Sequence, residues 1–535
     1  MLLFFFFGLD KIAAIFRQLI IARQFGLSVE VDVFNIANNL PDMLYTLISG
    51  GALSLALIPV MTGLIDKEGR AAGWKLFSSI ANLSFLAALV IAIFAAIFAE
   101  PIVSSQIGIA PGFKKEQQQL VVNLMRLNLI ATIIFSISGL VMGGLQANEH
   151  FLTPAMAPVL YNIGQIIGAV ILAPDHPYHL GKISLPCFGL GVYGLVYGVL
   201  IGALLHLLIQ IPDLVQCEFH WSPKIEFKEN SVQKVLRMLG PRILSVFFVQ
   251  MIFIVRDNLA SRLSSGSVSA LSYGYMFQQL PETLIGTALG TAILPSISLF
   301  VSQRKQQEFS VVVNKASRIG LAFALGSAAI MAAGMEPVIE FAFKLNTAQN
   351  MLLLWTLRGF LVGLAGHCLL EVANRAFYAQ QNAIIPLIGT IANLLVYIIL
   401  GMMLYSKLDA PGISLTDSIA FTLQAAAMMI LLACPPARRL LQKRPISRFG
   451  KWISGEGYAF EMQLPVKFQM RQTILRSLCG SAFSGILCYW IIYKANFSQN
   501  ILVKSILGMG ISLALYLLFI IPEIKDFIKF DETND

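Results

Sequence analysis

Long apolar segments recur along the whole chain and restrict its fold more than any other feature. A helix that crosses a bilayer needs about 20 mostly apolar residues. We expect helices of this kind near residues 3–26, 32–64, 75–99, 119–146, 153–173, 188–212, 234–262, 267–302, 310–334, 350–379, 384–405, 414–434, 473–493 and 501–521. Only 13% of the residues are charged, about half the share in soluble proteins. The sequence therefore predicts an all-α polytopic membrane protein with about 14 transmembrane helices.

The basic residues are grouped in short segments between these apolar runs, which predicts an orientation in the membrane. Cytoplasmic loops of membrane proteins carry an excess of lysine and arginine. With a cytoplasmic N-terminus, the predicted cytoplasmic loops hold Lys67, Arg70, Lys75, Lys224, Lys228, Lys234, Arg237, Arg304, Lys305, Arg438, Arg439, Lys443, Arg444, Arg448 and Lys451. We expect both termini in the cytoplasm. The net charge of +9 is explained by these loops, so it does not indicate a nucleic-acid partner.

Motifs for catalysis or for metal binding do not stand out. The six cysteines are scattered without a metal-binding spacing, and the chain has no P-loop, no GxSxG and no HExxH. The start, MLLFFFFGLDKIAAIF, lacks a basic region and a cleavage site, so it is interpreted as the beginning of the first helix. We expect a transporter rather than an enzyme, with no cofactor and no metal site.

Two stretches of the chain match at long range and predict an internal repeat. The matched positions are Arg17 with Arg256, Arg23 with Arg262, Gly26 with Gly266, Pro41 with Pro281, Arg126 with Arg358, and Pro154 with Pro386. An even number of helices separates the copies, so both halves enter the membrane from the same side, with a cavity between them. The predicted parts are a six-helix half at 1–222, a second at 223–434, a basic cytoplasmic linker at 435–472 and a helix pair with tail at 473–535.

Charged side chains inside apolar helices mark candidate binding sites, because burying a charge at mid-bilayer costs at least ~2.5–3.5 kcal/mol. Arg17, Asp32, Arg256 and Asp257 lie inside or at the start of apolar segments. We expect Arg17 and Arg256, which are related by the repeat, to face the cavity. An arginine fork stays charged there and donates paired hydrogen bonds to a phosphate. The buried arginines thus predict an anionic substrate.

Other charged residues have a structural interpretation beside the functional one. His367, Glu371 and Arg375 recur every four residues and so share one helix face. In the structural interpretation, Glu371 and Arg375 form an ion pair that only stabilises the bundle. In the functional one, all three residues take part in transport. Similarly, Arg23 and Arg262 lie near helix ends, where they bind substrate or extend to the membrane interface. Both interpretations stay open at this point.

Several blocks of sequence resemble one family of membrane transporters. They are ARQFG followed by D-VFNIANNLP and GGALSLALIPV within 22–60, APGF at 110–113, SRLSSGSVSALSYGY to AILPSIS at 261–298, and NRAFYAQQNAIIP at 374–386. They resemble the MurJ/MviN lipid II flippases of the multidrug/oligosaccharidyl-lipid/polysaccharide exporter superfamily.

The resemblance implies a fold, a location and an activity. Expected are two six-helix repeats in a V-shaped bundle plus a C-terminal helix pair, in the bacterial cytoplasmic (inner) membrane. The implied activity moves undecaprenyl-diphosphate-linked peptidoglycan precursor from the cytoplasmic to the periplasmic leaflet by alternating access. The implied substrate-binding residues are Arg17 and Asp32. Membrane lipids and cell-wall synthesis enzymes are the further implied partners.

The chain also departs from the family pattern. Tyr45 and Met276 stand where the family carries arginines, and Arg256 is our hypothesis for a compensating charge. Sodium coupling in some members implies Asp257 and Asn393 as ion ligands, while H⁺ or membrane potential remain alternatives. Three other functions stay open. The protein exports another polyprenyl-diphosphate-linked saccharide, or it is a drug/cation antiporter, which predicts an acidic cavity. The third is a non-transporting scaffold.

Overall fold

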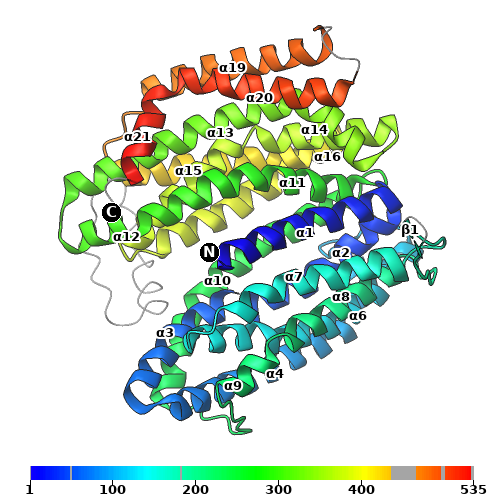
Figure 1. Ribbon diagram of the computed structural model, residues 1–535, viewed down its shortest axis with the longest axis vertical. Coiled ribbons are helices and arrows are strands. Elements are labelled where there is room, and N and C mark those ends of the chain that lie inside the picture. Colours follow the sequence, from blue (N-terminus) through cyan, green and yellow to red (C-terminus); the bar gives the residue numbers. More distant parts are fainter. Residues whose placement is uncertain (1, 49–50, 181–182, 435–464, 496–499, 532–535) are drawn as a thin grey trace. The chain divides into compact units, whose positions relative to one another are not determined.

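The structure, a computed structural model, describes all residues except 1, 49–50, 181–182, 435–464, 496–499 and 532–535 (Figure 1). Nearly all described elements are helices, which confirms the predicted all-α class. The chain forms two compact units, Met1–Ser269 and Ala270–Asp535. Part of the predicted linker, residues 435–464, lies outside the described residues.

Unit 1 contains the elements up to the start of α11. In chain order they are α1 (Leu2–Phe25), α2 (Val29–Ile48), α3 (Gly51–Glu68), α4 (Arg70–Ile97), α5 (Ala99–Ser104), α6 (Lys115–Ala147), α7 (Leu152–Ile167), the π-helix η1 (Gly168–Leu172), β1 (His179–Leu180), β2 (Ile183–Ser184), α8 (Val192–Leu208), α9 (Ile211–Gln216) and α10 (Asn230–Ala260). The two short strands pair antiparallel. α6 packs against α2, α3, α4 and α8, and α7 packs against α1 and α8.

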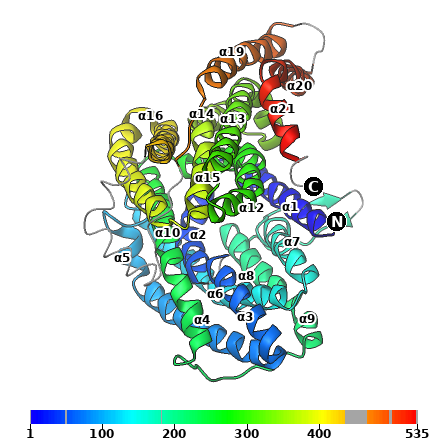
Figure 2. The same cartoon turned by 90° about the vertical axis from the view of Figure 1, so that its left-hand side faces the viewer.

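Unit 2 contains the remaining elements, beginning within α11. They are α11 (Ser267–Glu282), the π-helix η2 (Thr283–Thr287), α12 (Ala288–Ser302), α13 (Gln306–Phe343), α14 (Thr347–Leu361), α15 (Leu364–Ala379), α16 (Ile384–Ala433), α19 (Arg471–Tyr493), α20 (Ile501–Phe519) and α21 (Ile521–Asp531). α13 lies at the centre, against α12, α14, α15, α19 and α20. Figure 2 shows α19 and α20 side by side next to α13.

Ten helices in the described chain are long and apolar enough to cross a membrane, and α14 with α15, bent by 41°, makes an eleventh. The predicted number of fourteen is therefore not confirmed. α1 is outside this set because Asp10, Lys11 and Arg17 interrupt its apolar sequence. The predicted helix 32–64 is divided between α2 and α3.

One further boundary differs from the sequence prediction. The helices expected at 384–405 and 414–434 both fall within α16. Asp409 breaks this helix with a non-helical backbone (φ 52°, ψ −143°), and Pro411 follows directly. Because proline cannot donate the backbone hydrogen bond of a continuing helix, the break divides α16 into two segments.

In the second part of each half, helix boundaries and backbone hydrogen bonds repeat at one constant spacing. α6 begins and ends at 115 and 147, and the α14–α15 pair begins and ends at 347 and 379, a difference of 232 at each end. The next helices begin at 152 and 384, again 232 apart. The turns between them match: His150 N donates to the Leu145 carbonyl (2.9 Å), and Asn382 N donates to the Phe377 carbonyl (2.9 Å).

The two arginines related by this spacing make similar contacts, although their carbonyl partners are 236 residues apart. Arg126 Nε donates to the Ala96 carbonyl in α4, and Arg358 Nε donates to the Ala332 carbonyl in α13, each at 3.0 Å. Each arginine thus satisfies a backbone oxygen of the preceding long helix. These matched contacts support the internal repeat predicted from the sequence.

Glycines allow α7 and α8 to approach closely within unit 1. A Cβ atom added to Gly164 would lie 2.3 Å from the Gly202 Cα, and one added to Gly168 would lie 2.6 Å from the Gly198 Cα. Small residues at such positions let transmembrane helices pack backbone against backbone.

The variant Gly164→Ala is therefore expected to destabilise the protein by about 1–3 kcal/mol, the usual cost of overpacking. The thermal unfolding midpoint in detergent should fall. Gly63→Ala in α3 is the matched control, because an added Cβ there meets nothing within 4 Å. Equal midpoints for the two variants would contradict the packing argument.

The segment that joins α9 to α10 is attached to α4. Trp74 Nε1 donates to the Cys217 carbonyl at 2.8 Å. Lys75 Nζ lies 2.9 Å from Glu226 Oε2, and this hydrogen bond lowers the pKa of the Glu226 carboxyl. The segment before α10 is thus held against α4 by specific side-chain contacts.

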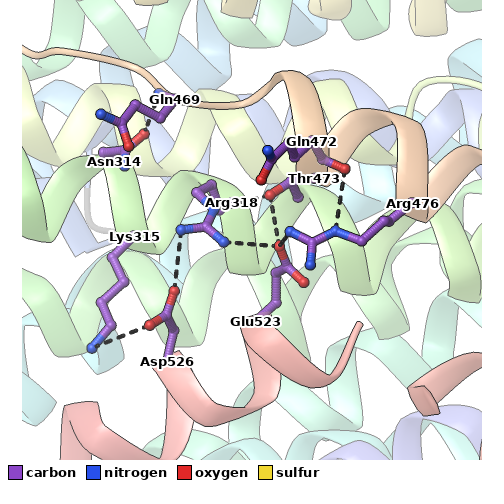
Figure 3. Close-up of polar contacts among 9 residues, drawn as sticks. All are labelled: Asn314, Lys315, Arg318, Gln469, Gln472, Thr473, Arg476, Glu523 and Asp526. Atoms are coloured by element: carbon purple, nitrogen blue, oxygen red, sulfur yellow. Dashed lines mark hydrogen bonds and ion pairs between the residues drawn. The ribbon is translucent and has the colours of Figure 1, made fainter. Parts of the chain in front are cut away.

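The C-terminal helix α21 is held by a buried carboxylate (Figure 3). Glu523 is fully buried and accepts hydrogen bonds from Arg318 (3.0 Å), Thr473 (2.6 Å) and Arg476 (3.3 Å). Asp526 lies 3.3 Å from Arg318 as well. A buried charge with several donors is far less costly than an isolated one, so these contacts fix α21 against α13 and α19.

Candidate functional site

Arg17, the first predicted substrate ligand, lies between α1 and α7 in unit 1. Its Nη1 donates to Asn162 Oδ1 at 3.1 Å, and Asn162 Nδ2 donates to Asp10 Oδ1 at 2.9 Å. The Arg17 side chain is half-buried. In this contact the arginine is oriented by a neutral amide, which suits an anion-binding residue.

The surroundings of Arg17 include an acid and a row of aromatic rings. Arg17 interacts electrostatically with Asp42 and with Tyr161. Tyr45 packs against Phe135 (centroids 5.1 Å apart), which packs against Tyr161 (4.9 Å). Tyr45, where the resemblance implies an arginine, is therefore accommodated by aromatic packing, and Arg17 is the cation among these side chains.

Asp32 has protein partners for both carboxylate oxygens. It is 2% exposed and accepts hydrogen bonds from the backbone of Gly266 (2.6 Å) and from the backbone and hydroxyl of Ser269 (2.7 and 2.5 Å). Gly266 has φ 88°, and a Cβ there would lie 2.8 Å from Leu27. These contacts join the first turn of α2 to the start of α11, in the manner of a helix cap.

Arg256 and Asp257, predicted for substrate and ion binding, are partners of each other. Arg256 Nε lies 2.9 Å from Asp257 Oδ1, and the guanidinium lies 5.1 Å from the centre of the Phe253 ring. Asn39 Nδ2 donates to Asp257 Oδ2. An anion would have to compete with Asp257 for Arg256, so the compensating role we expected for Arg256 is weakened by a neutralising neighbour.

Arg23 and Arg262 both have positions that fit their structural interpretation. Both side chains are exposed, Arg23 in the last turn of α1 and Arg262 just after α10. Arg262 Nη2 donates to the Gln106 carbonyl at 3.0 Å and to Asn258 Oδ1 at 3.2 Å. Arg262 thus ties the end of α10 to the segment after α5.

In unit 2 the charged face of α15 meets two acids that we did not single out in the sequence. His367 Nε2 lies 3.0 Å from Asp417 Oδ2 in α16, and Nδ1 lies 3.6 Å from Glu282 Oε1 in α11. Glu371 pairs with Arg375 at 3.2 Å, as the structural interpretation expected. Glu282 and Asp417 could have been identified from the sequence, because each is an acid inside an apolar segment.

Two other positions from the sequence prediction lie in unit 2. Asn393 is buried, and its Nδ2 donates to Gln424 Oε1 at 2.8 Å. Met276 is half-buried in α11. Asp257 belongs to unit 1, so the predicted pairing of Asp257 with Asn393 stays a prediction.

Metal binding is not indicated by the described residues, where no three His, Cys, Asp or Glu side chains are grouped suitably for an ion. Arginine, amide and carboxylate side chains from several different helices lie buried or half-buried among apolar residues. This combination defines a class, a polytopic α-helical membrane transporter with polar groups buried among its helices.

Solved structures share this fold. A lipid II flippase MurJ in an inward closed conformation matches with a TM-score of 0.76 at 22% identity, covering 98% of this chain and 99% of the other. An inward-facing multidrug resistance MATE family transporter of the MOP superfamily matches with a TM-score of 0.63 at 16% identity, covering 82% and 96%.

Sequence comparison identifies the family. The family model described as lipid II flippase MurJ matches residues 21–448. The lipid II flippase MurJ of Burkholderia cenocepacia is 27% identical over 79% of this chain and 81% of its own length. The probable lipid II flippase MurJ of Bdellovibrio bacteriovorus is 24% identical over 85% of each chain. The chain belongs to the lipid II flippase MurJ family.

Proposed function

We propose that this protein flips lipid II, the lipid-linked peptidoglycan precursor, from the cytoplasmic to the periplasmic leaflet by alternating access. The observation that carries the proposal is the family match, which runs through both structural repeats. The surrounding bacterial inner membrane supplies the substrate as one of its lipids. An undecaprenyl diphosphate headgroup is an anion, for which an oriented arginine is a suitable ligand.

Arg17 is the residue to which we assign the diphosphate. It is half-buried and oriented by Asn162, so its guanidinium is held in one orientation before a ligand arrives. We assign Arg256, Arg23 and Arg262 only secondary roles at the substrate, because Asp257 neutralises Arg256 and the other two are exposed near helix ends. Asp32 is assigned to the positioning of α2 against α11.

The arrangement in the membrane is also part of the proposal. Both termini face the cytoplasm, as the basic loops require. The functional halves are residues 1–222 and 223–434 around a cavity, followed by the linker 435–472 and the helix pair 473–535. The spacing of 232 residues between α6 and the α14–α15 pair, and between the starts of α7 and α16, supports this division. Asp257 and Asn393 bind the coupling cation if sodium is used, and cell-wall synthesis enzymes are proposed partners.

Complementation tests the function. A bacterium depleted of its own lipid II flippase should regain growth when the wild-type chain is expressed. Immunoblotting of the membrane fraction confirms that the chain is present. Membrane expression without rescue would contradict lipid II as the substrate and favour another polyprenyl-diphosphate-linked saccharide.

A further inference from the structure

Three titratable side chains from three helices meet inside unit 2, apart from Arg17 and its neighbours. Glu282 ends α11, His367 lies in α15 and Asp417 lies in α16. The imidazole has a carboxylate on each nitrogen, at 3.6 Å (Glu282) and 3.0 Å (Asp417). The side chains are 18%, 5% and 9% exposed in chain order. We call these residues the Glu282–His367–Asp417 triad.

The charges of the triad do not cancel. With the imidazole protonated and both carboxylates ionised, the group carries a net charge of −1. An uncompensated charge away from water is costly, and a buried group usually binds or releases a proton to avoid it. Glu282 Oε2 is buried and has no hydrogen-bond donor in the described chain. That oxygen is the place where one additional proton would bind.

The other charged and titratable groups near the triad leave this balance unchanged. On α15, Glu371 and Arg375 neutralise each other at 3.2 Å. The Cys368 thiol adjoins Gly286 of η2, and a protonated thiol carries no charge.

Among the described residues, Glu282 and Asp417 are the acids within ion-pair distance of the His367 ring. On α13, three charged side chains face other elements: Lys315 and Arg318 pair with α21, and Glu336 accepts a hydrogen bond from Tyr493 of α19. The sequences of α12 and η2 contain no charged residue. His367 is bounded on a further side by the Phe421 ring, stacked at 4.3 Å.

Glu282 lies at a point where the helix is irregular and can bend. Pro281 precedes it, and η2, a π-helical segment, begins at the next residue. Prolines and π-segments interrupt the regular hydrogen bonding of a helix and are frequent where helices bend. His367 attaches this point to α15, and Asp417 attaches α15 to the second segment of α16. Protonation of Glu282 would weaken its ion pair with His367 and so would ease bending at this point.

We propose that the Glu282–His367–Asp417 triad binds the proton that is coupled to transport, with Glu282 as the group that gains and releases it. In this step a hydronium ion gives its proton to the Glu282 carboxylate. One O–H bond of hydronium breaks, leaving water, one O–H bond forms at Glu282, and the net charge of the triad changes from −1 to 0. The proposal rests on the proposed transport function. It selects H⁺ over Na⁺, because an imidazole held between two carboxylates offers a sodium ion few oxygens.

A titration tests the proton site without transport. Purified full-length protein in detergent, labelled with ¹⁵N-histidine, is followed by NMR, and the His367 signal is assigned by its loss in His367→Asn. In wild type we expect a pH-dependent shift of the His367 signal that reports the state of Glu282. Glu282→Gln should remove or displace that shift, and Glu336→Gln, which retains an acceptor for Tyr493, should not. A His367 signal unaffected by Glu282→Gln would overturn the site.

Transport under imposed gradients tests the coupling. In proteoliposomes with lipid II, each coupled proton should change the steady-state distribution of lipid II about tenfold per unit of pH difference. Glu282→Gln should still equilibrate lipid II but lose this dependence, while Glu282→Asp should restore it and Glu336→Gln should behave as wild type.

The outcomes separate the coupling from the proposed function. Wild-type flipping that ignores the pH difference, or follows a sodium gradient instead, would overturn the proton proposal and leave lipid II flipping intact. A complete lack of flipping would contradict the proposed function, and the histidine titration would still decide whether the triad binds a proton.

Discussion

Arg17→Ala is expected to abolish rescue of flippase-depleted cells while the protein still reaches the membrane. Removing one partner of a buried, charge-assisted contact costs about 2–5 kcal/mol of binding free energy, which weakens substrate binding at least ~30-fold. Arg17→Lys should retain part of the activity, because the charge remains but the planar fork is lost. Growth after depletion and lipid II flipping by purified protein are the two measurements.

The control for Arg17 is Arg126→Ala. Arg126 is exposed, and its Nε donates to a carbonyl of α4, so this variant removes an arginine from the same unit without touching the Arg17 neighbourhood. It should grow like wild type. Full rescue by Arg17→Ala, at a membrane level equal to that of the control, would contradict the assignment of the diphosphate to Arg17.

Asp32→Ala is expected to unfold or severely destabilise unit 1. The substitution leaves two backbone N–H groups and the Ser269 hydroxyl without their acceptor. Breaking a buried charged contact of this kind costs about 3–5 kcal/mol. Asp32→Asn keeps one carbonyl oxygen of similar shape and should lose less. Thermal unfolding in detergent, followed by circular dichroism, measures both.

The unfolding experiment also separates two roles for Asp32. Glu30→Ala is the matched control, since Glu30 is an exposed acid in the same first turn of α2. If Asp32→Ala unfolded at the control's temperature but lost flipping, Asp32 would act on the substrate and our structural assignment would be wrong. A lower midpoint with Asp32→Ala, partly restored in Asp32→Asn, is the result we expect.

The sequence predicted the helical class, the internal repeat and most helix positions because these depend on local composition. Apolar segments of sufficient length leave few choices in a bilayer, and the spacing between Arg126 and Arg358 reappears in the helix boundaries. The break at Asp409 and the division of α2 from α3 were missed, because a break within a continuous apolar run leaves little trace in hydropathy.

Side-chain partners were predicted much less well, because they depend on which helices become neighbours. Arg256 was expected to face a substrate, yet Asp257 neutralises it from the adjacent position. Asp32 was expected to bind substrate, yet backbone groups more than 230 residues away in the sequence satisfy it. Glu282 and Asp417 are visible in the sequence as charges inside apolar segments, but only the fold places His367 between them.

Direct observation of lipid II movement is the most decisive test of the account. Purified protein is reconstituted into liposomes that hold fluorescent lipid II in both leaflets, and a membrane-impermeant quencher reports the fraction exposed outside over time. The account predicts that wild-type protein makes the whole pool accessible, while Arg17→Ala and protein-free liposomes leave the inner pool protected. Equal protection with wild-type protein and with no protein would contradict lipid II flipping by this chain.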